Sequence, residues 1–549
     1  MPLGLLFVSC LDLEAATTWA RQRAEPGDRG SVMIAPLGSA EVSLAIATQA
    51  AAVPPPPAPA PQPDPANLPL PVESEEDAWG ELDDEPAAPS QADEAAELAP
   101  AEEQATESGD GDGPPVLASI GQATWILAEP KKKSRKIGYL RAGAVVTRSA
   151  EPVSGPGCKN GYYRVEPEGY VCRGKSVTFD RFHPVVEALA RRPDRGGLPF
   201  DYVTSRAQTP VLYGRIPTQA EQRAAEPDLA HHLRKHRATQ RDKDFVPLPE
   251  PGPVPNVLLY GRPAPGLFGD KPRSDGDVVL GKAGIRSGFA LIAQFEEDGR
   301  RFGLTTELAV LPLDRTRWVR PSSFEGIRLD EEVSLPVAFV LKRRATRYAK
   351  DEHGRMVAGA PLGHREAVPL KEGASGTFLE ATDGSFVRAE DVRQIPRMTR
   401  RPTWASPGRR WIDVSLLRQS LVAYEGDRPV FATLVSTGAG GIGDPKETHA
   451  TIQGVFLIHT KHVTATMDGD DAGDEFDLRD VPFVQYSHEG FALHAAYWHD
   501  DFGTPRSHGC VNLAPKDAAF LFGFTTPEVP EAWHAALSLR RGTVVYTHP

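Results

Sequence analysis

Short runs of β-branched and aromatic residues, separated by Gly, Pro or Asn, recur along the chain from residue 116. In the first stretch these runs are Ala123–Ala128, Ile137–Leu140, Ala144–Val146, Tyr162–Val165 and Tyr170–Cys172. Runs of this length and composition are typical of β-strands joined by tight turns. We therefore predict a small β-barrel of about 60 residues over 116–180.

A weaker copy of the same pattern appears at residues 333–396, where Ala345–Ala349 aligns with the run that begins at Ala123. The order of the runs in both stretches resembles that of bacterial SH3-like modules in envelope proteins. This resemblance implies a second small β-barrel at 333–396. The region between them, 181–332, is also rich in strand-like runs, but the pattern does not assign its type.

One charged segment of the middle region, Ala220–Asp244, has the composition of a helix or a loose connection. It contains His231, His232 and His236, whose spacing would allow a metal site. The surrounding charges instead favour a solvated face, so no metal is predicted there.

After residue 409 the strand-like runs become longer. They are Trp411–Val414, the hairpin formed by Ser420–Tyr424 and Pro429–Val435, and Gly454–Thr460. A helix is predicted over Pro515–Phe522, because proline suits its first position and Ala518, Leu521 and Phe522 recur on one face. We therefore predict a mainly β, multidomain chain whose last domain covers 409–549.

Charge is distributed unevenly along the 549 residues. Residues 54–115 contain 17 Asp or Glu, 15 Pro and no Lys or Arg, which predicts a disordered, extended linker. The whole chain has 74 acidic and 61 basic residues, so 57 acidic residues remain outside the linker. The folded parts are thus nearly neutral, which excludes a generally basic nucleic-acid-binding protein. A specific acidic binding segment is the alternative interpretation of the linker.

The first 53 residues carry features of an export segment. Leu3–Val8 is a short apolar run that ends at Ser9-Cys10 and resembles a bacterial lipobox, in which the cysteine is lipidated. A tether to the membrane through Cys10 is therefore one hypothesis, and an export signal within 1–53 is the other. The sequence contains no run of about 18 apolar residues, so we predict no transmembrane helix.

Two of the four cysteines, Cys158 and Cys172, flank the predicted strand at Tyr162. A disulfide between them would close a hairpin and would indicate an oxidising compartment. Two reduced thiols in a small core are the alternative.

Cys510 is the residue whose surrounding sequence most clearly indicates catalytic reactivity. A cysteine attacks as a thiolate and needs a base nearby, and both His494 and His508 are candidates. Gly509 lets the backbone approach a substrate closely, and the N–H groups of Gly509 and Cys510 could form an oxyanion hole. The pattern predicts acyl transfer through a thioester.

The run Ser507-His508-Gly509-Cys510-Val511-Asn512, with His494 upstream, resembles the signature of the L,D-transpeptidase catalytic domain of the YkuD type. The resemblance covers residues 409–549 and implies a β-rich sandwich with the cysteine at the base of a cleft. It implies that Cys510 is the nucleophile and that His494 is its base, oriented through a backbone carbonyl. It also implies that His508 supports the site and that Ser507 and Asn512 shape the loop.

Two features depart from the family pattern. Only 12 residues separate His494 from Ser507, and the usual Thr-Pro-x-Gly before the next strand is replaced by Thr451-Ile452-Gln453-Gly454. The first departure bears on the roles of the two histidines, and the second bears on the wall of the cleft.

Four neighbours of the motif are candidates for substrate contact. They are Arg506, which could pair with a carboxylate of the substrate, and Tyr497, Trp498 and His499. Wall or core packing is the alternative for Tyr497 and Trp498, and a solvated loop is the alternative for His499. No cofactor is expected.

The resemblance implies a cell-envelope enzyme, periplasmic or extracytoplasmic, that acts on peptidoglycan stem peptides. Cys510 would form a thioester with the stem peptide and transfer it to an amine, giving a 3→3 cross-link or attaching an envelope protein. Hydrolysis of the same thioester, an L,D-carboxypeptidase activity, is one alternative. A wall-binding protein without catalysis is the other.

Overall fold

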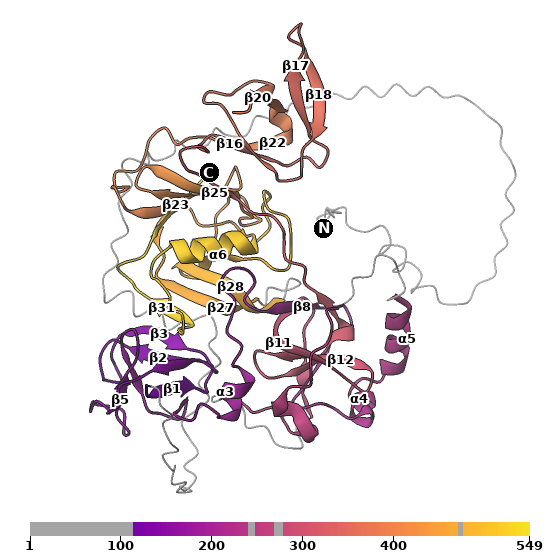
Figure 1. Cartoon of the computed structure of the whole chain (residues 1–549), viewed down its shortest axis with the longest axis vertical. Coiled ribbons are helices and arrows are strands. Elements are labelled where there is room, and N and C mark those ends of the chain that lie inside the picture. Colours follow the sequence, from indigo (N-terminus) through magenta and orange to yellow (C-terminus); the bar gives the residue numbers. More distant parts are fainter. Residues whose placement is uncertain (1–113, 240–247, 268–277, 470–475) are drawn as a thin grey trace, which may run out of the picture. The chain divides into compact units, whose positions relative to one another are not determined.

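The computed structural model describes residues 114–239, 248–267, 278–469 and 476–549 (Figure 1). The predicted export segment 1–53, with Cys10, and nearly all of the predicted linker 54–115 lie outside the described residues. The described part is mainly β, as predicted, with short strands in several sheets. Among these residues, no helix combines the length and the hydropathy that crossing a membrane requires.

The first module consists of seven short strands that form two sheets. The strands are β1 (Val116–Ser119), β2 (Thr124–Leu127), β3 (Lys136–Leu140), β4 (Val145–Thr147), β5 (Tyr162–Arg164), β6 (Tyr170–Cys172) and β7 (Val177–Thr178). Their order is β4-β1-β7 in one sheet and β3-β2-β6-β5 at the end of the other. The predicted disulfide between Cys158 and Cys172 is present, with the two Cα atoms 5.8 Å apart, and it fastens the loop before β5 to the end of β6.

The module near residue 360 repeats this pairing strand for strand. Its strands are β16 (Val337–Val340), β17 (Thr346–Lys350), β18 (Met356–Pro361), β19 (Ala367–Pro369), β20 (Phe378–Glu380), β21 (Phe386–Arg388) and β22 (Val392–Ile395), with the 3₁₀ turn η4 (Ala389–Asp391) before the last one. The orders β19-β16-β22 and β18-β17-β21-β20 match those of the first module. We call these two units the first and the last β module; the SH3-like assignment stays a prediction.

The middle region, whose type the sequence pattern left open, has the same pairing again. Its strands are β8 (Asp201–Ser205), β9 (Val211–Tyr213), β10 (Val279–Lys282), β11 (Ser287–Glu297), β12 (Arg300–Thr305), β13 (Val310–Pro312) and β14 (Thr316–Trp318), with η3 (Leu313–Arg315) before β14. Strand β8 pairs with β11 and β14, while β9 pairs with β10 and β13, and β13 pairs with β12. We call this unit the middle β module, and the short helix α3 (Pro184–Ala188) precedes it.

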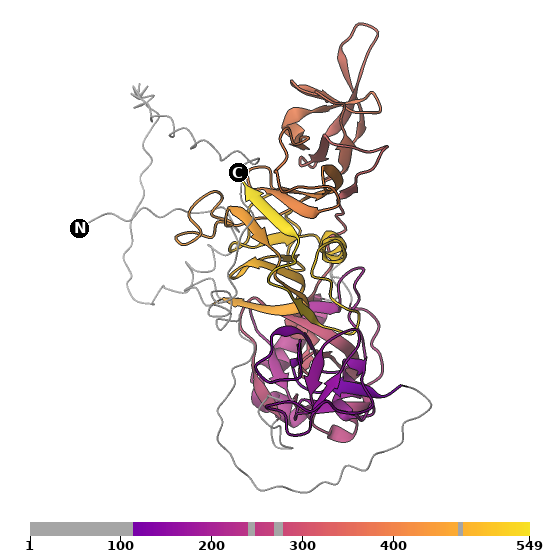
Figure 2. The ribbon, with the colours of Figure 1, turned by 90° about the vertical axis from the view of Figure 1, so that its left-hand side faces the viewer.

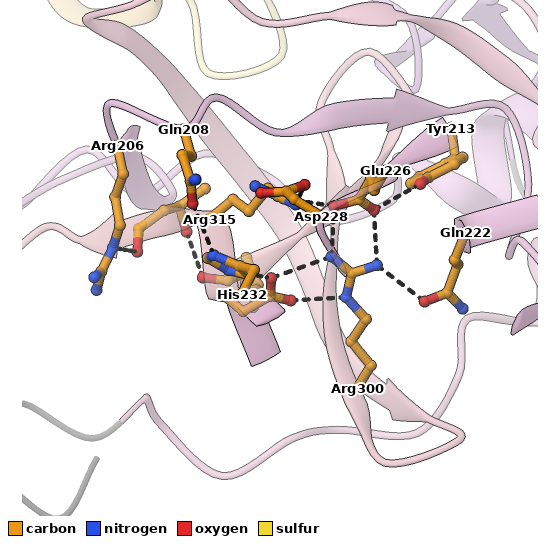
Figure 3. A network of polar contacts seen from close by, with 12 residues as sticks. Arg206, Gln208, Tyr213, Gln222, Glu226, Asp228, His232, Arg300 and Arg315 are labelled. Carbon is orange, nitrogen blue, oxygen red and sulfur yellow. Dashed lines mark hydrogen bonds and ion pairs between the residues drawn. The ribbon is translucent and has the colours of Figure 1, made fainter. Parts of the chain in front are cut away.

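An insertion between β9 and β10 distinguishes the middle β module from the other two. It holds α4 (Gln219–Ala225), α5 (Leu229–Thr239) and the 3₁₀ segment η2 (Asn256–Gly261). The buried Arg300 ties the insertion to the module, since its guanidinium donates to Glu226 beyond α4 and to Asp314 in η3 (Figure 3). Glu226 also accepts from Tyr213 on β9 at 2.7 Å.

The prediction of a solvated histidine face on this insertion is wrong for one residue. His232 on α5 has a side chain that is only 10% exposed, and its Nε2 lies 3.0 Å from Asp314 (Figure 3). The partner comes from η3, far along the chain, so the local charge pattern gave no indication of it. His232 therefore belongs to the buried polar network.

In its described residues, the C-terminal domain is a sandwich of two sheets with a helix against them, which agrees with the predicted β-rich sandwich. One sheet has the order β15-β25-β24-β23-β32-β26 and contains β15 (Ile327–Arg328), β23 (Arg410–Ser415), β24 (Ser420–Glu425), β25 (Arg428–Leu434), β26 (Gly454–Leu457) and β32 (Val544–His548). The other contains β27 (Thr460–Gly469), β28 (Phe476–His488), β29 (Phe491–Ala495), β30 (Val511–Leu513) and β31 (Ala535–Leu537). Buried apolar residues of both sheets form one core, among them Ile412, Phe431, Phe483, Leu493 and Val511.

Helix α6 (Pro515–Phe524) follows β30 and begins at the proline that the sequence predicted. It packs against β28 and β29, beside which it lies in both ribbon views (Figures 1 and 2). Ala518, Leu521 and Phe522 enter the same core as the two sheets, because they recur on one face of the helix. The helix thereby fixes the strands that carry the candidate site.

Candidate active site

Cys510 lies between Gly509 and Val511, the first residue of β30 (Val511–Leu513). Its side chain is partly exposed, and its Sγ lies 3.6 Å from the carbonyl oxygen of Gly490, with which it makes a weak hydrogen bond. The next residue, Val511, pairs with Leu493 on the parallel strand β29. The nucleophile candidate therefore directly precedes a strand of the sheet, and its side chain is partly accessible to solvent.

His494 lies on β29 opposite Asn512 of β30. Asn512 and His494 are paired residues of two parallel strands, so their side chains face the same side of the sheet. The register therefore places the histidine that the sequence proposed as the base on β29, next to the strand that directly follows Cys510.

The orientation of His494 leaves one ring nitrogen available for a proton. The side chain is 3% exposed, and Nδ1 lies 3.2 Å from the carbonyl oxygen of Ala495. A carbonyl can only accept, so Nδ1 carries the hydrogen in the neutral ring and Nε2 is the acceptor. Burial lowers the pKa of His494 to about 4, although the bond to Ala495 opposes the shift, so the ring is neutral at pH 7.

The thiol of Cys510 is also neutral at this pH. Its surroundings raise the pKa of Cys510 to about 11 through burial, against a smaller opposing effect of the backbone at Ala492. Neither group is charged at pH 7, so the two do not form a thiolate–imidazolium ion pair in the resting protein.

The loop before Cys510 is fixed by hydroxyl groups. Ser507 Oγ accepts from the Gly509 N–H at 3.1 Å and donates to the Cys510 carbonyl at 2.5 Å. Gly509 has a φ of +130°, and an added Cβ would lie 2.8 Å from the ring of Phe491, so glycine is required here.

Thr451, which sequence reasoning did not select, supports the same loop from the opposite side. Its hydroxyl donates to the Gly509 carbonyl at 2.7 Å and accepts from the Gly438 N–H at 2.8 Å. Thr451 is the threonine of the Thr-Pro-x-Gly pattern, in which Ile452 replaces the proline here, and this pattern was the only sequence signal that pointed to it.

His508 differs from His494 in its surroundings. It is exposed, and its ring lies 4.6 Å from the ring of His449 and 5.0 Å from that of Phe476, measured between centroids. These two aromatic neighbours come from the loop after β25 and from the start of β28, and the sequence motif does not include them. His508 is therefore part of an aromatic cluster at the surface, beside the nucleophile loop.

Asn512 belongs to the motif, and His499 and Arg506 precede it in the chain. Asn512 Nδ2 lies 2.9 Å from His499 Nε2, and burial lowers the pKa of His499 to about 4. Arg506 forms an ion pair with Asp501 and is half exposed. The sequence proposed both Arg506 and His499 as substrate contacts, and both lie within a few residues of the nucleophile loop.

Tyr497 and Trp498 occupy the positions of packing residues. Tyr497 is 3% exposed, stacks on Tyr202 of the middle β module at 4.3 Å and donates to the Arg479 carbonyl at 3.2 Å. This burial favours core packing, the alternative that the sequence left open for Tyr497. Trp498 lies edge-on to Tyr497, with its ring 5.7 Å from that of His494.

Parts of this chain are similar to known proteins. A structure of the catalytic domain of an E. faecium L,D-transpeptidase is 23% identical to this chain, covers 26% of this chain and 98% of its own, and superposes with a TM-score of 0.20. An L,D-transpeptidase structure from Mycobacterium smegmatis is 16% identical, with coverages of 43% and 89% and a TM-score of 0.21. No curated protein matches the chain. Residues 409–546 match the family model of the L,D-transpeptidase catalytic domain, YkuD, and the chain therefore contains a catalytic domain of this family.

Proposed function

We propose that the protein is a peptidoglycan L,D-transpeptidase with Cys510 as its nucleophile. The observation that supports this most directly is that β29, which carries His494, pairs with β30, the strand that directly follows Cys510. A cysteine with a neutral imidazole in this relation is suited to attack on an amide carbonyl. The substrate class, a peptidoglycan stem peptide, follows from the family of residues 409–546.

In the first half of the proposed reaction, the Cys510 sulfur attacks the carbonyl at the L-centre of the stem peptide. His494 Nε2 takes the thiol proton and then gives it to the leaving nitrogen, so the terminal D-residue departs as an amine and a thioester remains. The Cys510 N–H is the candidate oxyanion donor, because the Gly509 N–H is engaged by Ser507.

In the second half, the amine of an acceptor attacks the thioester. His494 takes a proton from the amine and returns it to the sulfur, which leaves a new amide bond and the free thiol. We propose that His508, together with His499 and Arg506, contacts the substrate, since they lie beside the nucleophile loop. The acceptor is a second stem peptide or an envelope protein.

We also propose an extracytoplasmic location. The Cys158–Cys172 disulfide supports an oxidising compartment, as does the substrate of the family. A lipid tether at Cys10 belongs to the same proposal, and metabolic labelling with a fatty acid in cells that carry Cys10→Ser would test it.

The test of the function uses the purified full chain and a tetrapeptide stem donor, with and without an amine acceptor. We expect an adduct at Cys510 with a β-lactam of the carbapenem class, loss of the terminal D-residue from the donor, and a cross-linked product when the acceptor is present. Cys510→Ala should give neither adduct nor product. Release of the D-residue without cross-linking would favour the carboxypeptidase, and full turnover by Cys510→Ala would refute the thioester mechanism. Binding of wall polymer without any turnover would leave only the wall-binding alternative.

A further inference from the structure

Eight residues, 496–503, join the strand of His494 to the loop that carries Cys510, and we call them the linking segment. Their side chains enter two different hydrophobic cores. Ala496 and Phe502 pack with Phe324 and Phe339 next to the last β module, whereas Tyr497 packs with Tyr202 in the middle β module. The segment between base and nucleophile is thus in contact with two upstream modules.

At the end of the segment nearer Gly503, Asp500 contacts the buried guanidinium of Arg365. Arg365, in the loop before β19, donates to both carboxylate oxygens of Asp500, at 2.7 and 2.6 Å, and to the Asp500 carbonyl at 3.1 Å. The Arg365 side chain is 8% exposed, and its guanidinium lies 5.1 Å from the ring of Phe324. A bidentate ion pair of this kind fixes the orientation of the Asp500 carboxylate as well as its distance from Arg365.

Asp500 is the neighbour of His499, and His499 contacts Asn512 on the strand of the nucleophile. One hydrogen bond therefore joins the residue next to Asp500 to β30, the strand that directly follows Cys510. Gly503 ends the segment with a φ of +103°, and an added Cβ would lie 3.1 Å from Leu341 of the last β module.

At the near end, the contact is an aromatic stack. The Tyr202 ring lies 4.3 Å from that of Tyr497, and the Tyr202 hydroxyl donates to the Asp480 carbonyl at 2.8 Å. Gly288 on β11 leaves room for Tyr497, because a Cβ at this position would lie 2.0 Å from the Tyr497 hydroxyl. Tyr497 in turn supports Trp498, whose ring faces His494.

We propose that Arg365 and Tyr202 are positioning residues for acyl transfer: the last and the middle β modules hold opposite ends of the linking segment and thereby set the position of His494 relative to Cys510. The expected effect on the rate of acylation rests on the proposed function. The restraint on residues 496–503 is a property of the fold and does not depend on that function. Small misplacements of catalytic groups have large effects on rate, about 10- to 100-fold.

The test compares full-length variants in two measurements, the first-order rate of carbapenem acylation at Cys510 and the deuterium exchange of residues 496–510. Arg365→Gln and Asp500→Asn should each slow acylation about tenfold or more and speed up the exchange. The double variant should be no slower than either single variant, because both remove the same contact. Arg355→Gln, which breaks an exposed pair with Asp351 in the same module, is the control and should change neither measurement.

The middle module is tested by Gly288→Ala, which directs a methyl group at the Tyr497 hydroxyl. Gly281→Ala in the same module is its matched control, since a Cβ there meets no atom within 4 Å. We expect slower acylation in Gly288→Ala only.

Acylation rates and exchange equal to those of the controls would overturn the proposal, as would faster exchange with unchanged acylation. If the unmodified protein is not acylated at Cys510, the proposed function fails. In that case exchange alone decides whether the two modules restrain the segment.

Discussion

Both partners of the proposed proton transfer are uncharged at pH 7, and this has a measurable consequence. With a pKa of about 11, about one Cys510 in 10⁴ is a thiolate at pH 7. With a pKa of about 4, His494 is almost entirely neutral and ready to accept a proton. In the proposed mechanism the imidazole therefore acts on the rate of attack and not by stabilising a thiolate in the resting protein.

His494→Ala is the perturbation that exposes this difference. A positioned general base contributes about 10²- to 10⁴-fold, so acylation of Cys510 by a carbapenem at pH 7 should fall by that factor in the variant. His508→Ala should lower the rate by less than about tenfold, because His508 is exposed and lies in an aromatic cluster with His449 and Phe476. Quenched-flow sampling with mass spectrometry of the intact protein gives both rates.

Alkylation with iodoacetamide provides the pH dependence. Cys10→Ser leaves Cys510 as the one free thiol in the sequence once Cys158 and Cys172 are paired. We expect the alkylation rate to rise about tenfold per pH unit between pH 7 and 10, because the thiolate fraction rises by that factor below the pKa. A plateau below pH 8 would reveal a preformed ion pair and refute the reasoning. A larger loss of acylation in His508→Ala than in His494→Ala would reverse the assignment of the base.

Three further predictions concern stability. Arg141→Met should lower the free energy of unfolding by about 3–5 kcal/mol in urea denaturation at pH 7, because the buried Asp480 loses its ion-pair partner. Burial alone would raise the pKa of Asp480, but Arg141 keeps it below its ordinary value. The stability lost in Arg141→Met should therefore become smaller as the pH falls below about 4. A loss of stability that does not depend on pH would show that the ion pair is not its cause. Reduction of Cys158–Cys172, or Cys158→Ser with Cys172→Ser, should cost about 3 kcal/mol in the same assay, and an unchanged midpoint would show that the bridge adds nothing. Burial raises the pKa of Asp517 to about 7, so the native protein loses stability as the pH rises from about 4 to 7; Asp517→Asn should lack this loss and melt higher at pH 8, and identical pH profiles would contradict it.

The sequence predicted best where the signal is local. The start of α6 at Pro515 and the pairing of Cys158 with Cys172 each depend on residues that are close along the chain. The relation of His494 to Cys510 required a strand register, which the family resemblance supplied in advance.

The middle β module was not predicted because its pairing joins distant strands. Strand β8 pairs with β11, more than 80 residues later, and the insertion with α4 and α5 lies between them. The same reason applies to His232, whose partner Asp314 is 82 residues away, and to Tyr497, whose partner Tyr202 belongs to another module. Side chains that meet only in the tertiary structure leave no periodic pattern in the sequence.

The catalytic sheet continues into the modules at two places. Strand β31 pairs with β3 of the first module at Gly138 and Tyr139, and β28 pairs with β11 of the middle module at Asp477 and Leu478. A fragment comprising 409–549 alone would expose the backbone groups of both strands along these stretches. Such open edges recruit strands from other molecules, so the isolated fragment should self-associate where the longer chain does not. The modules therefore also protect the enzyme against aggregation, and a soluble shortened version would need charged or proline substitutions at these two edges.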